Sequence, residues 1–366
     1  MKIMAVEAIA LDIPFSHGGR SAGWGGSAWT TLATTLVKVS TDSGHIGYGE
    51  AFSYNCQRAV QAAIEDMIAP IVIGRNLEEM DAVMYDLQQK LHLFGRYGIT
   101  MFAISGLDIA LWDIKAKAQQ VSLSHLLAET PSVSLSVYAS LFRYGDPDTV
   151  AERCALALDE GYGWIKLHET EATEVSAARA ALGVNIPMMV DTNCPWSQAD
   201  AHAKAEALKP YDLLWLEEPI FPPENFAALA KLQTDVGIPI AAGENACTVF
   251  EFEKMFAAAA VTYAQPSVTK VGGVSELLKV IDSASTAGVA VMPHSPYFGP
   301  GLLATLHVVA ARIPDSLVER FYVQPEATLY GAWCQPTNGC FQIPDGPGLG
   351  VEPDADVISE YRVSAV

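Results

Sequence analysis

The chain carries a series of residues suited to acid–base or metal chemistry, each at the end of a short apolar run. Successive members lie 25 to 27 residues apart, except for one interval of 50. They are Lys166, Asp191, Glu217, Glu244, His294 and Glu319. One buried strand followed by one amphipathic helix takes about 25 residues. Because polar residues at the carboxyl ends of successive parallel strands meet at one mouth of a (β/α) barrel, we expect these side chains to converge.

Three of these residues are acids, Asp191, Glu217 and Glu244, and each follows an apolar run directly. Any one of them taken alone would be read as an ordinary surface acid. Three converging carboxylates would repel one another, and at least one would have to be protonated unless a cation lay between them. With only oxygen ligands on offer, Mg²⁺ is the first choice. The register of the three acids therefore predicts a magnesium site.

Lys166 and His168 are two residues apart on one predicted strand, so their side chains point to the same side of it. A buried lysine beside a metal can neutralise an anionic substrate, and a histidine is suited to proton abstraction at neutral pH. His294 should face the site from the other side of the barrel mouth, where it could act as an acid or a second base. For both histidines the alternative is a purely structural, hydrogen-bonded role.

Alternating strands and helices must position these residues. Parallel strands that are covered on both faces read as continuous apolar runs, as Met188–Val190 and Leu213–Leu216 do. We predict a first barrel strand at Ser134–Ala139 and its helix at Pro147–Glu160. Later helices are expected at about 172–182, 197–208, 223–234, 248–258, 274–287 and 300–311. The predicted fold class is α/β, a (β/α)7β-type TIM barrel.

The first third of the chain has a different pattern. Strands are expected at 1–13, 30–39 and 45–49, and helices at 56–73, 77–93 and 98–119. Three strands followed by three helices indicate an α+β domain. We expect a capping domain over residues 1–128, the barrel with the metal site over 129–320, and a C-terminal segment, 321–366, that returns to the capping domain.

A Gly/Ser-rich loop, residues 16–27, separates the first two predicted strands. It carries His17, Arg20 and Trp24, and Tyr54 follows the third strand. Loops with isolated large polar residues often cover ligands. We therefore predict that these four residues contact the substrate.

Composition narrows the class of partner. The 366 residues include 50% hydrophobic and 17% charged residues, and the net charge is −20 without a basic cluster. Nucleic acid and anionic membranes are therefore poor partners, and no apolar run reaches the length of a membrane span. The N-terminus has no secretory pattern, and the six cysteines contain no C-x-x-C pair. We expect a cytoplasmic homo-oligomer whose partner is a small molecule.

Several motifs resemble those of the mandelate racemase/muconate lactonizing enzyme family of the enolase superfamily. They are Val190-Asp191-Thr192-Asn193, Leu216-Glu217-Glu218-Pro219, Ala242-Gly243-Glu244-Asn245, Ile109-Ala110-Leu111-Trp112-Asp113-Ile114-Lys115, Gln265-Pro266, Gly272-Gly273-Val274 and Gly348-Leu349-Gly350. The resemblance runs essentially end to end. It implies Mg²⁺ bound by the three acids, a substrate carboxylate chelated to it, and abstraction of the proton α to that carboxylate. Mg²⁺ and cationic side chains would stabilise the resulting enediolate.

The resemblance also implies roles for other residues. Glu319 matches a glutamate that hydrogen-bonds the substrate carboxylate, and Asn193 matches a polar substrate contact. The family's second strand usually carries Lys-x-Lys with the second lysine as base. Here the pair is Lys166-x-His168, so by position His168 would be the base and Lys166 would contact the carboxylate.

A second departure concerns His294. In the mandelate-racemase-like branch, the strand-seven histidine is supported by an aspartate in Gln-Pro-Asp, where this chain has Gln265-Pro266-Ser267. We expect His294 to lack its usual carboxylate partner, which would weaken it as a base but leave it able to donate a proton. Lys270 lies past the usual position and is expected to be structural.

The reaction predicted first is dehydration of a sugar acid or related hydroxy acid. A racemase or epimerase, or a cycloisomerase, acting on a 2-hydroxy acid or acid lactone is the alternative. From other classes we weigh a Schiff-base aldolase using Lys166, which would not need the three acids, and a non-catalytic sugar-acid binding protein. A zinc amidohydrolase is disfavoured because the metal positions offer no His-x-His.

Overall fold

The N-terminal part of the protein contains an antiparallel sheet. The computed structural model describes residues 1–19 and 28–363. The strand order of this sheet is β12-β1-β2-β3. The strands are β1 (Ile3–Ser16), β2 (Thr31–Thr41), β3 (Ile46–Phe52) and β12 (Gln324–Pro325). The three N-terminal strands therefore form as the sequence predicts, and a fourth comes from the far end of the chain.

Helices pack against this sheet. The first predicted helix consists of α1 (Gln57–Ala62), a π-helical segment (Ala63–Ile68) and α2 (Ala69–Val72). It is followed by α3 (Met80–Lys90) and α4 (Gly98–Ala118). Their apolar side chains form one buried cluster with the sheet.

Helix α4 lies directly on β3. Most of its residues are buried, which explains why it reads as apolar on nearly every face. Gly47 and Gly49 allow the close approach, because a Cβ at either position would collide with the α4 backbone at Ala110 or Gly106.

The rest of the fold is a barrel-like sheet of parallel strands in the order β10-β9-β8-β7-β6-β5-β4-β11. The strands are β4 (Ser134–Ser140), β5 (Ile165–Leu167), β6 (Met188–Asp191), β7 (Leu213–Glu217), β8 (Ile240–Ala242), β9 (Tyr263–Ala264), β10 (Ala290–Val291) and β11 (Val318–Phe321). The last of them, β11, pairs with the first, β4, so the sheet curls round on itself. This confirms the predicted fold class.

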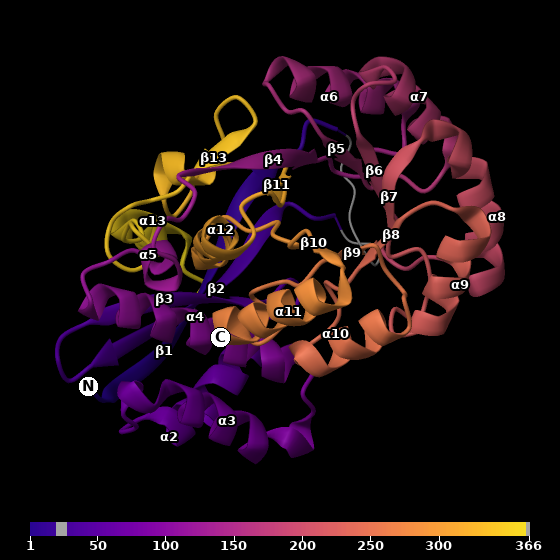
Figure 1. Cartoon of the computed structure of the whole chain (residues 1–366). Coiled ribbons are helices and arrows are strands. Elements are labelled where there is room, and N and C mark those ends of the chain that lie inside the picture. The colour runs from indigo at the N-terminus through magenta and orange to yellow at the C-terminus, as the bar shows by residue number, and fades with distance from the viewer. Residues whose placement is uncertain (20–27, 364–366) are drawn as a thin grey trace.

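One helix follows each of these strands except the last, and a short helix, α5 (Leu123–Leu127), precedes them. The helices are α6 (Pro147–Asp159), α7 (Ala172–Leu182), α8 (Gln198–Leu208), α9 (Phe226–Val236), α10 (Thr248–Ala257), α11 (Gly273–Ala287) and α12 (Pro300–Arg312). In Figure 1, α6 to α11 form an arc on the outer side of the strands. The prediction began one helix at residue 223, but α9 starts at Phe226 because the Asn225 side chain accepts a hydrogen bond from the N–H of Ala228 and caps it.

The C-terminal segment contacts both parts of the fold. β12 pairs with β1, and the N–H of Val363, after α13 (Ala355–Tyr361), donates to the carbonyl of Ala10 at 2.9 Å. β13 (Cys340–Gln342) instead pairs antiparallel with the barrel strand β4. The domain boundaries drawn from the sequence stay a prediction.

The antiparallel sheet is fastened to the barrel next to its mouth. The Glu50 carboxylate on β3 accepts the N–H of Gly301, at the start of α12, at 2.8 Å. The N–H of Phe52 donates to the carbonyl of Thr269, which follows β9, at 3.3 Å. Trp112 of α4 donates its indole N–H to the Ser275 hydroxyl on α11 at 2.9 Å. The end of β3 therefore lies over the carboxyl ends of the barrel strands.

Candidate active site

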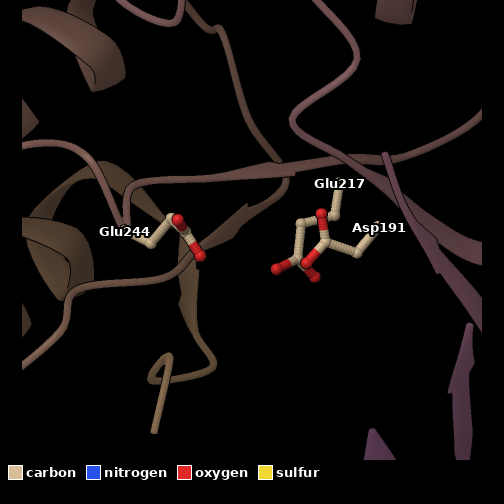
Figure 2. Close-up of side chains that lie close together, drawn as sticks. All are labelled: Asp191, Glu217 and Glu244. Atoms are coloured by element: carbon tan, nitrogen blue, oxygen red, sulfur yellow. The ribbon is translucent and has the colours of Figure 1, made fainter. Parts of the chain in front are cut away.

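The three strand-end acids converge at the mouth of the barrel. Asp191 ends β6, Glu217 ends β7, and Glu244 lies two residues beyond β8. One carboxylate oxygen from each lies within 4.8 Å of the other two. In Figure 2, Asp191 and Glu217 lie side by side and Glu244 faces them. The convergence that the spacing predicts is therefore present in the structure.

The electrostatics of this group fit a cation. Burial and the neighbouring charge of Asp191 raise the pKa of Glu217 well above its ordinary value. Burial also acts to raise the pKa of Asp191, but Lys166 and His168 beside it lower that pKa below its ordinary value. One buried carboxylate of the pair is thus held ionised while its neighbour resists ionisation. A divalent ion between oxygen ligands would relieve this conflict.

Lys166 already supplies positive charge to this group. Its side chain on β5 is fully buried, and Nζ lies 3.2 Å from Asp191, 3.0 Å from Glu217 and 2.9 Å from Glu319. That an ammonium group is held between two of the candidate ligands shows that the acids can hold positive charge.

Neighbouring groups fix the orientation of the acids. Trp215, which is fully buried inside the barrel with Tyr138 and Met189, donates its indole N–H to Glu217 Oε2 at 2.9 Å. The backbone N–H of Asn193 donates to Asp191 Oδ1 at 3.0 Å. The Asn193 side chain lines the cavity above the acids, and its Oδ1 atom is buried without a partner among the described residues. An amide oxygen in that position can accept a hydrogen bond from a ligand.

His168 lies beside the acids with its ring orientation fixed. Its Nδ1 atom is 2.6 Å from the carbonyl oxygen of Leu141, and its Nε2 atom is 3.2 Å from Asp191 Oδ2. A carbonyl oxygen only accepts, so Nδ1 carries a proton. When Nε2 is protonated it can donate to Asp191, and when it is not it holds the lone pair that a proton acceptor requires.

His294 approaches the group from the opposite direction. Its Nε2 atom lies 2.8 Å from Glu244 Oε2, and its Nδ1 atom is buried without a partner among the described residues. The hydroxyl of Ser267 lies 2.5 Å from that of Tyr297. The sequence predicts no carboxylate partner for His294 at the usual position, and the contact between His294 and Glu244 was not predicted.

Two further charged residues adjoin the acids. Glu319 lines the cavity, and its Oε2 atom accepts the backbone N–H of Ser295 at 2.9 Å. Lys270 lies with Nζ 3.6 Å from Glu244 Oε1 and 3.2 Å from Asn245 Oδ1. Lys270 therefore adds positive charge beside the candidate metal ligand Glu244.

A cavity of about 600 Å³ lies over this group, between the barrel mouth and the antiparallel sheet. Tyr54 lines it, and its contact with a substrate stays a prediction. His17 instead stacks on Phe142, with ring centroids 4.1 Å apart, and is absent from the described residues that line the cavity. Arg20 and Trp24 lie outside the described residues.

Part of the cavity lining was not among the predicted site residues. Arg143, three residues beyond β4, lines the cavity and donates its Nε–H to the carbonyl of His168 at 2.5 Å. Polar residues that follow a barrel strand are expected at the mouth of the barrel, and this rule would also have identified Arg143, which follows the first barrel strand. Aromatic residues from separate segments also line the cavity, among them Trp29 and Phe321. No spacing in the sequence links them.

The fold and the site can now be compared with known proteins. Residues 27–128 match the mandelate racemase/muconate lactonizing enzyme N-terminal domain, and residues 149–357 match the enolase C-terminal domain-like family. The chain belongs to the mandelate racemase/muconate lactonizing enzyme family of the enolase superfamily. It is therefore an enolase-superfamily enzyme, and its three acids form a candidate metal site typical of the Mg-dependent members.

Its relatives include dehydratases and a cycloisomerase. The D-galactarolactone cycloisomerase of Agrobacterium fabrum is 29% identical over 99% of both chains. The D-galactonate dehydratase of Ralstonia nicotianae is 31% identical over 90% of this chain and 91% of its own. The structure of L-talarate dehydratase from a Polaromonas species, complexed with Mg and L-glucarate, superimposes with a TM-score of 0.84 at 26% identity, covering 99% of this chain and 98% of that one. Among the described residues of this protein, no helix combines the length and apolar character of a membrane span.

Proposed function

We propose that this enzyme removes the proton α to the carboxylate of a sugar acid and then eliminates water from it. The observation that carries the proposal is the convergence of Asp191, Glu217 and Glu244 beneath a cavity, with His168 and His294 approaching from opposite directions. This arrangement supports binding of a carboxylate at the acids, with proton-transfer groups on two sides of it.

His168 is the proposed base. The bond from Nδ1 to the carbonyl of Leu141 directs the lone pair on Nε2 toward the acids, where the carbon next to the substrate carboxylate would lie. Nε2 takes the α-proton, and the electron pair of the broken C–H bond moves toward the carboxylate to form an enediolate. Imidazole is the side chain that most often transfers protons in this way.

His294 is the proposed acid. When the enediolate collapses, the bond between C3 and its hydroxyl breaks, and the hydroxyl leaves as water with a proton from His294. The product is an enol that becomes a 2-keto-3-deoxy acid. Because His294 contacts Glu244 and His168 contacts Asp191, the two groups serve different faces of the substrate.

Asp191, Glu217 and Glu244 would hold Mg²⁺, since they present only oxygen ligands. When bound, the ion would supply positive charge that stabilises the enediolate. Lys166, which lies among Asp191, Glu217 and Glu319, adds a cationic group at the same end of the cavity. Glu319 and Asn193 line the cavity there and are the proposed hydrogen-bonding partners of the substrate carboxylate and its neighbouring hydroxyl.

Cycloisomerisation is the second candidate. The alignment with D-galactarolactone cycloisomerase spans 99% of both chains, which supports it. The same base would start this reaction, but the group that leaves C3 would be a ring oxygen rather than a hydroxyl.

The test is a panel of sugar acids and acid lactones in D₂O with Mg²⁺. We expect at least one compound to exchange its α-proton for deuterium and to give a keto acid. His168→Ala should abolish the exchange, whereas His294→Asn should retain exchange and lose keto-acid formation. Exchange that persists in His168→Ala would assign the base elsewhere. A compound that binds wild-type enzyme without any exchange would favour a non-catalytic binding protein.

A further inference from the structure

The cavity has two chemically different sides. The side formed by the barrel mouth carries the acids and the two histidines described above. The rest of the lining includes four aromatic residues from both parts of the fold: Trp29 and Tyr54 flank strands of the antiparallel sheet, Phe142 follows the barrel strand β4, and Phe321 ends the barrel strand β11. We call these four residues the aromatic wall.

The aromatic wall is a single packed unit. The rings of Trp29 and Phe321 stack with centroids 5.1 Å apart and an interplanar angle of 23°. Tyr54 lies 4.7 Å and Phe142 5.9 Å from Trp29. Phe15 supports the wall from behind by contacting three of its members. Rings held in this way offer a fixed apolar surface rather than an adaptable one.

Three polar groups near the aromatic wall already have hydrogen-bond partners within the protein. The indole N–H of Trp29 donates to the carbonyl of Thr31 at 2.7 Å. The Ser53 hydroxyl donates to the carbonyl of Ala33 at 3.2 Å, and the Glu50 carboxylate accepts the N–H of Gly301. A substrate hydroxyl placed against this side would give up its water for aromatic carbon, which is unfavourable.

The aromatic wall adjoins the reacting end of the cavity directly. Phe321 lies two residues beyond Glu319 on β11, so both side chains point to the same side of that strand. Phe142 follows β4, the strand that pairs with β11. A substrate whose carboxylate lies at the acids therefore has the aromatic wall within reach of its remote carbons.

From this we infer that the enzyme selects substrates whose carbons remote from the carboxylate present C–H groups to the aromatic wall. This inference rests on the proposed function and narrows its substrate class. Two kinds of sugar acid have the required chemistry: one that is deoxygenated at the far end of its chain, and one that is closed into a ring with a flat C–H face. A fully hydroxylated open-chain acid does not have it.

The experiment compares three acids of matched configuration with the wild-type enzyme. They are a six-carbon aldonate, its 6-deoxy counterpart and its ring-closed 3,6-anhydro counterpart. The readout is kcat/KM for deuterium exchange at the α-carbon in D₂O with Mg²⁺, which is common to all three. We expect one or both apolar-faced acids to exceed the parent by about tenfold or more, the size of discrimination that an apolar pocket can achieve. A preference for the 6-deoxy acid would show that the aromatic wall recognises the end of the carbon chain. A preference for the anhydro acid would show that it recognises the C–H face of the ring.

Exchange that is as fast with the fully hydroxylated parent as with both counterparts would overturn this inference and leave the proposed function standing. Absence of exchange from every acid would overturn the proposed function, and this inference with it.

Variants of Trp29 test the wall itself. Trp29→Gln replaces the ring with an amide that can pair with hydroxyls, so the preference should fall below about threefold. Trp29→Phe keeps an aromatic face and should retain most of the preference. The ratio of two substrates on one preparation is independent of the fraction of folded enzyme, and an undiminished ratio in Trp29→Gln would contradict the assignment of the wall.

Discussion

Replacing Lys166 with methionine should destabilise the metal-free protein, and Mg²⁺ should reverse the loss. The side chain is fully buried, and its ammonium group contacts Asp191, Glu217 and Glu319 at 3.2, 3.0 and 2.9 Å. Methionine has a similar length and no charge. The variant leaves three buried carboxylates without their shared cation, and removing one partner of a buried ion pair costs about 3–5 kcal/mol.

This cost converts into a measurable change in melting temperature. An unfolding entropy of about 2.1 cal/mol/K per residue gives about 0.8 kcal/mol/K for a chain of 366 residues. The variant in EDTA should therefore melt about 4–6 °C below wild type. Mg²⁺ should then raise its melting temperature more than that of wild type. In wild type the ion competes with the ammonium group for Asp191 and Glu217, whereas in the variant it does not.

Differential scanning calorimetry with and without EDTA and Mg²⁺ measures both effects. Lys231→Met is the matched control, because Lys231 is 63% exposed and pairs with Asp235 at 2.7 Å on the surface of α9. Exposed pairs contribute about 0–1 kcal/mol, so this variant should melt within about 1 °C of wild type in either condition. If Lys166→Met melted like the control in EDTA, or gained no more from Mg²⁺ than wild type does, the electrostatic account of the site would be wrong.

Two further predictions concern single carboxylates. Glu244→Gln should lower turnover by about a thousandfold and weaken Mg²⁺ binding in calorimetric titrations while the fold stays intact, because a proposed ligand and its charge are lost; near-wild-type turnover would refute the metal assignment. Glu50→Gln should make the protein more stable than wild type at pH 8 and similar to it at pH 5. Burial raises the pKa of Glu50 from 4.5 to about 7, so the folded state favours the protonated carboxyl. The stability that the protonated carboxyl contributes is complete below pH 4.5 and is lost as the pH rises through 7. The lost stability is at most about 3 kcal/mol. Chemical denaturation across this pH range measures the free energy of unfolding. If that free energy changed with pH in the same way in wild type and variant, the prediction would be contradicted.

The elements that carry the metal ligands could be predicted because they follow a simple period. A buried parallel strand reads as an apolar run, and a barrel brings the residue after each run to the same mouth. Asp191, Glu217 and Glu244 obey this rule, and their side chains meet. The start of α9 was misplaced although its Asn225 cap is an available signal, because the preceding prolines at 222 and 223 also suit a helix start.

The pairing of side chains within the site could not be predicted in the same way. The spacing predicts the side of the strand to which the Lys166 side chain points. It does not predict that the Lys166 ammonium group contacts Glu319, which lies on the strand two positions away in the sheet. The contact between His294 and Glu244 is likewise decided by rotamers. The aromatic wall joins β11 to the segments around residues 29, 54 and 142, and no periodicity relates such distant positions.

The hydrogen bonds between Glu50 and Gly301 and between Phe52 and Thr269 hold the antiparallel sheet against the mouth of the barrel. Two residues of the aromatic wall, Trp29 and Tyr54, thereby come from the part of the chain that forms the antiparallel sheet, whereas Phe142, Phe321 and the acids come from the barrel. Substitutions around Trp29 or Tyr54 can change which compounds are accepted without touching the atoms that move protons. A laboratory seeking a new specificity from this scaffold would diversify the segments around Trp29 and Tyr54 and keep the barrel residues that hold the acids and the histidines.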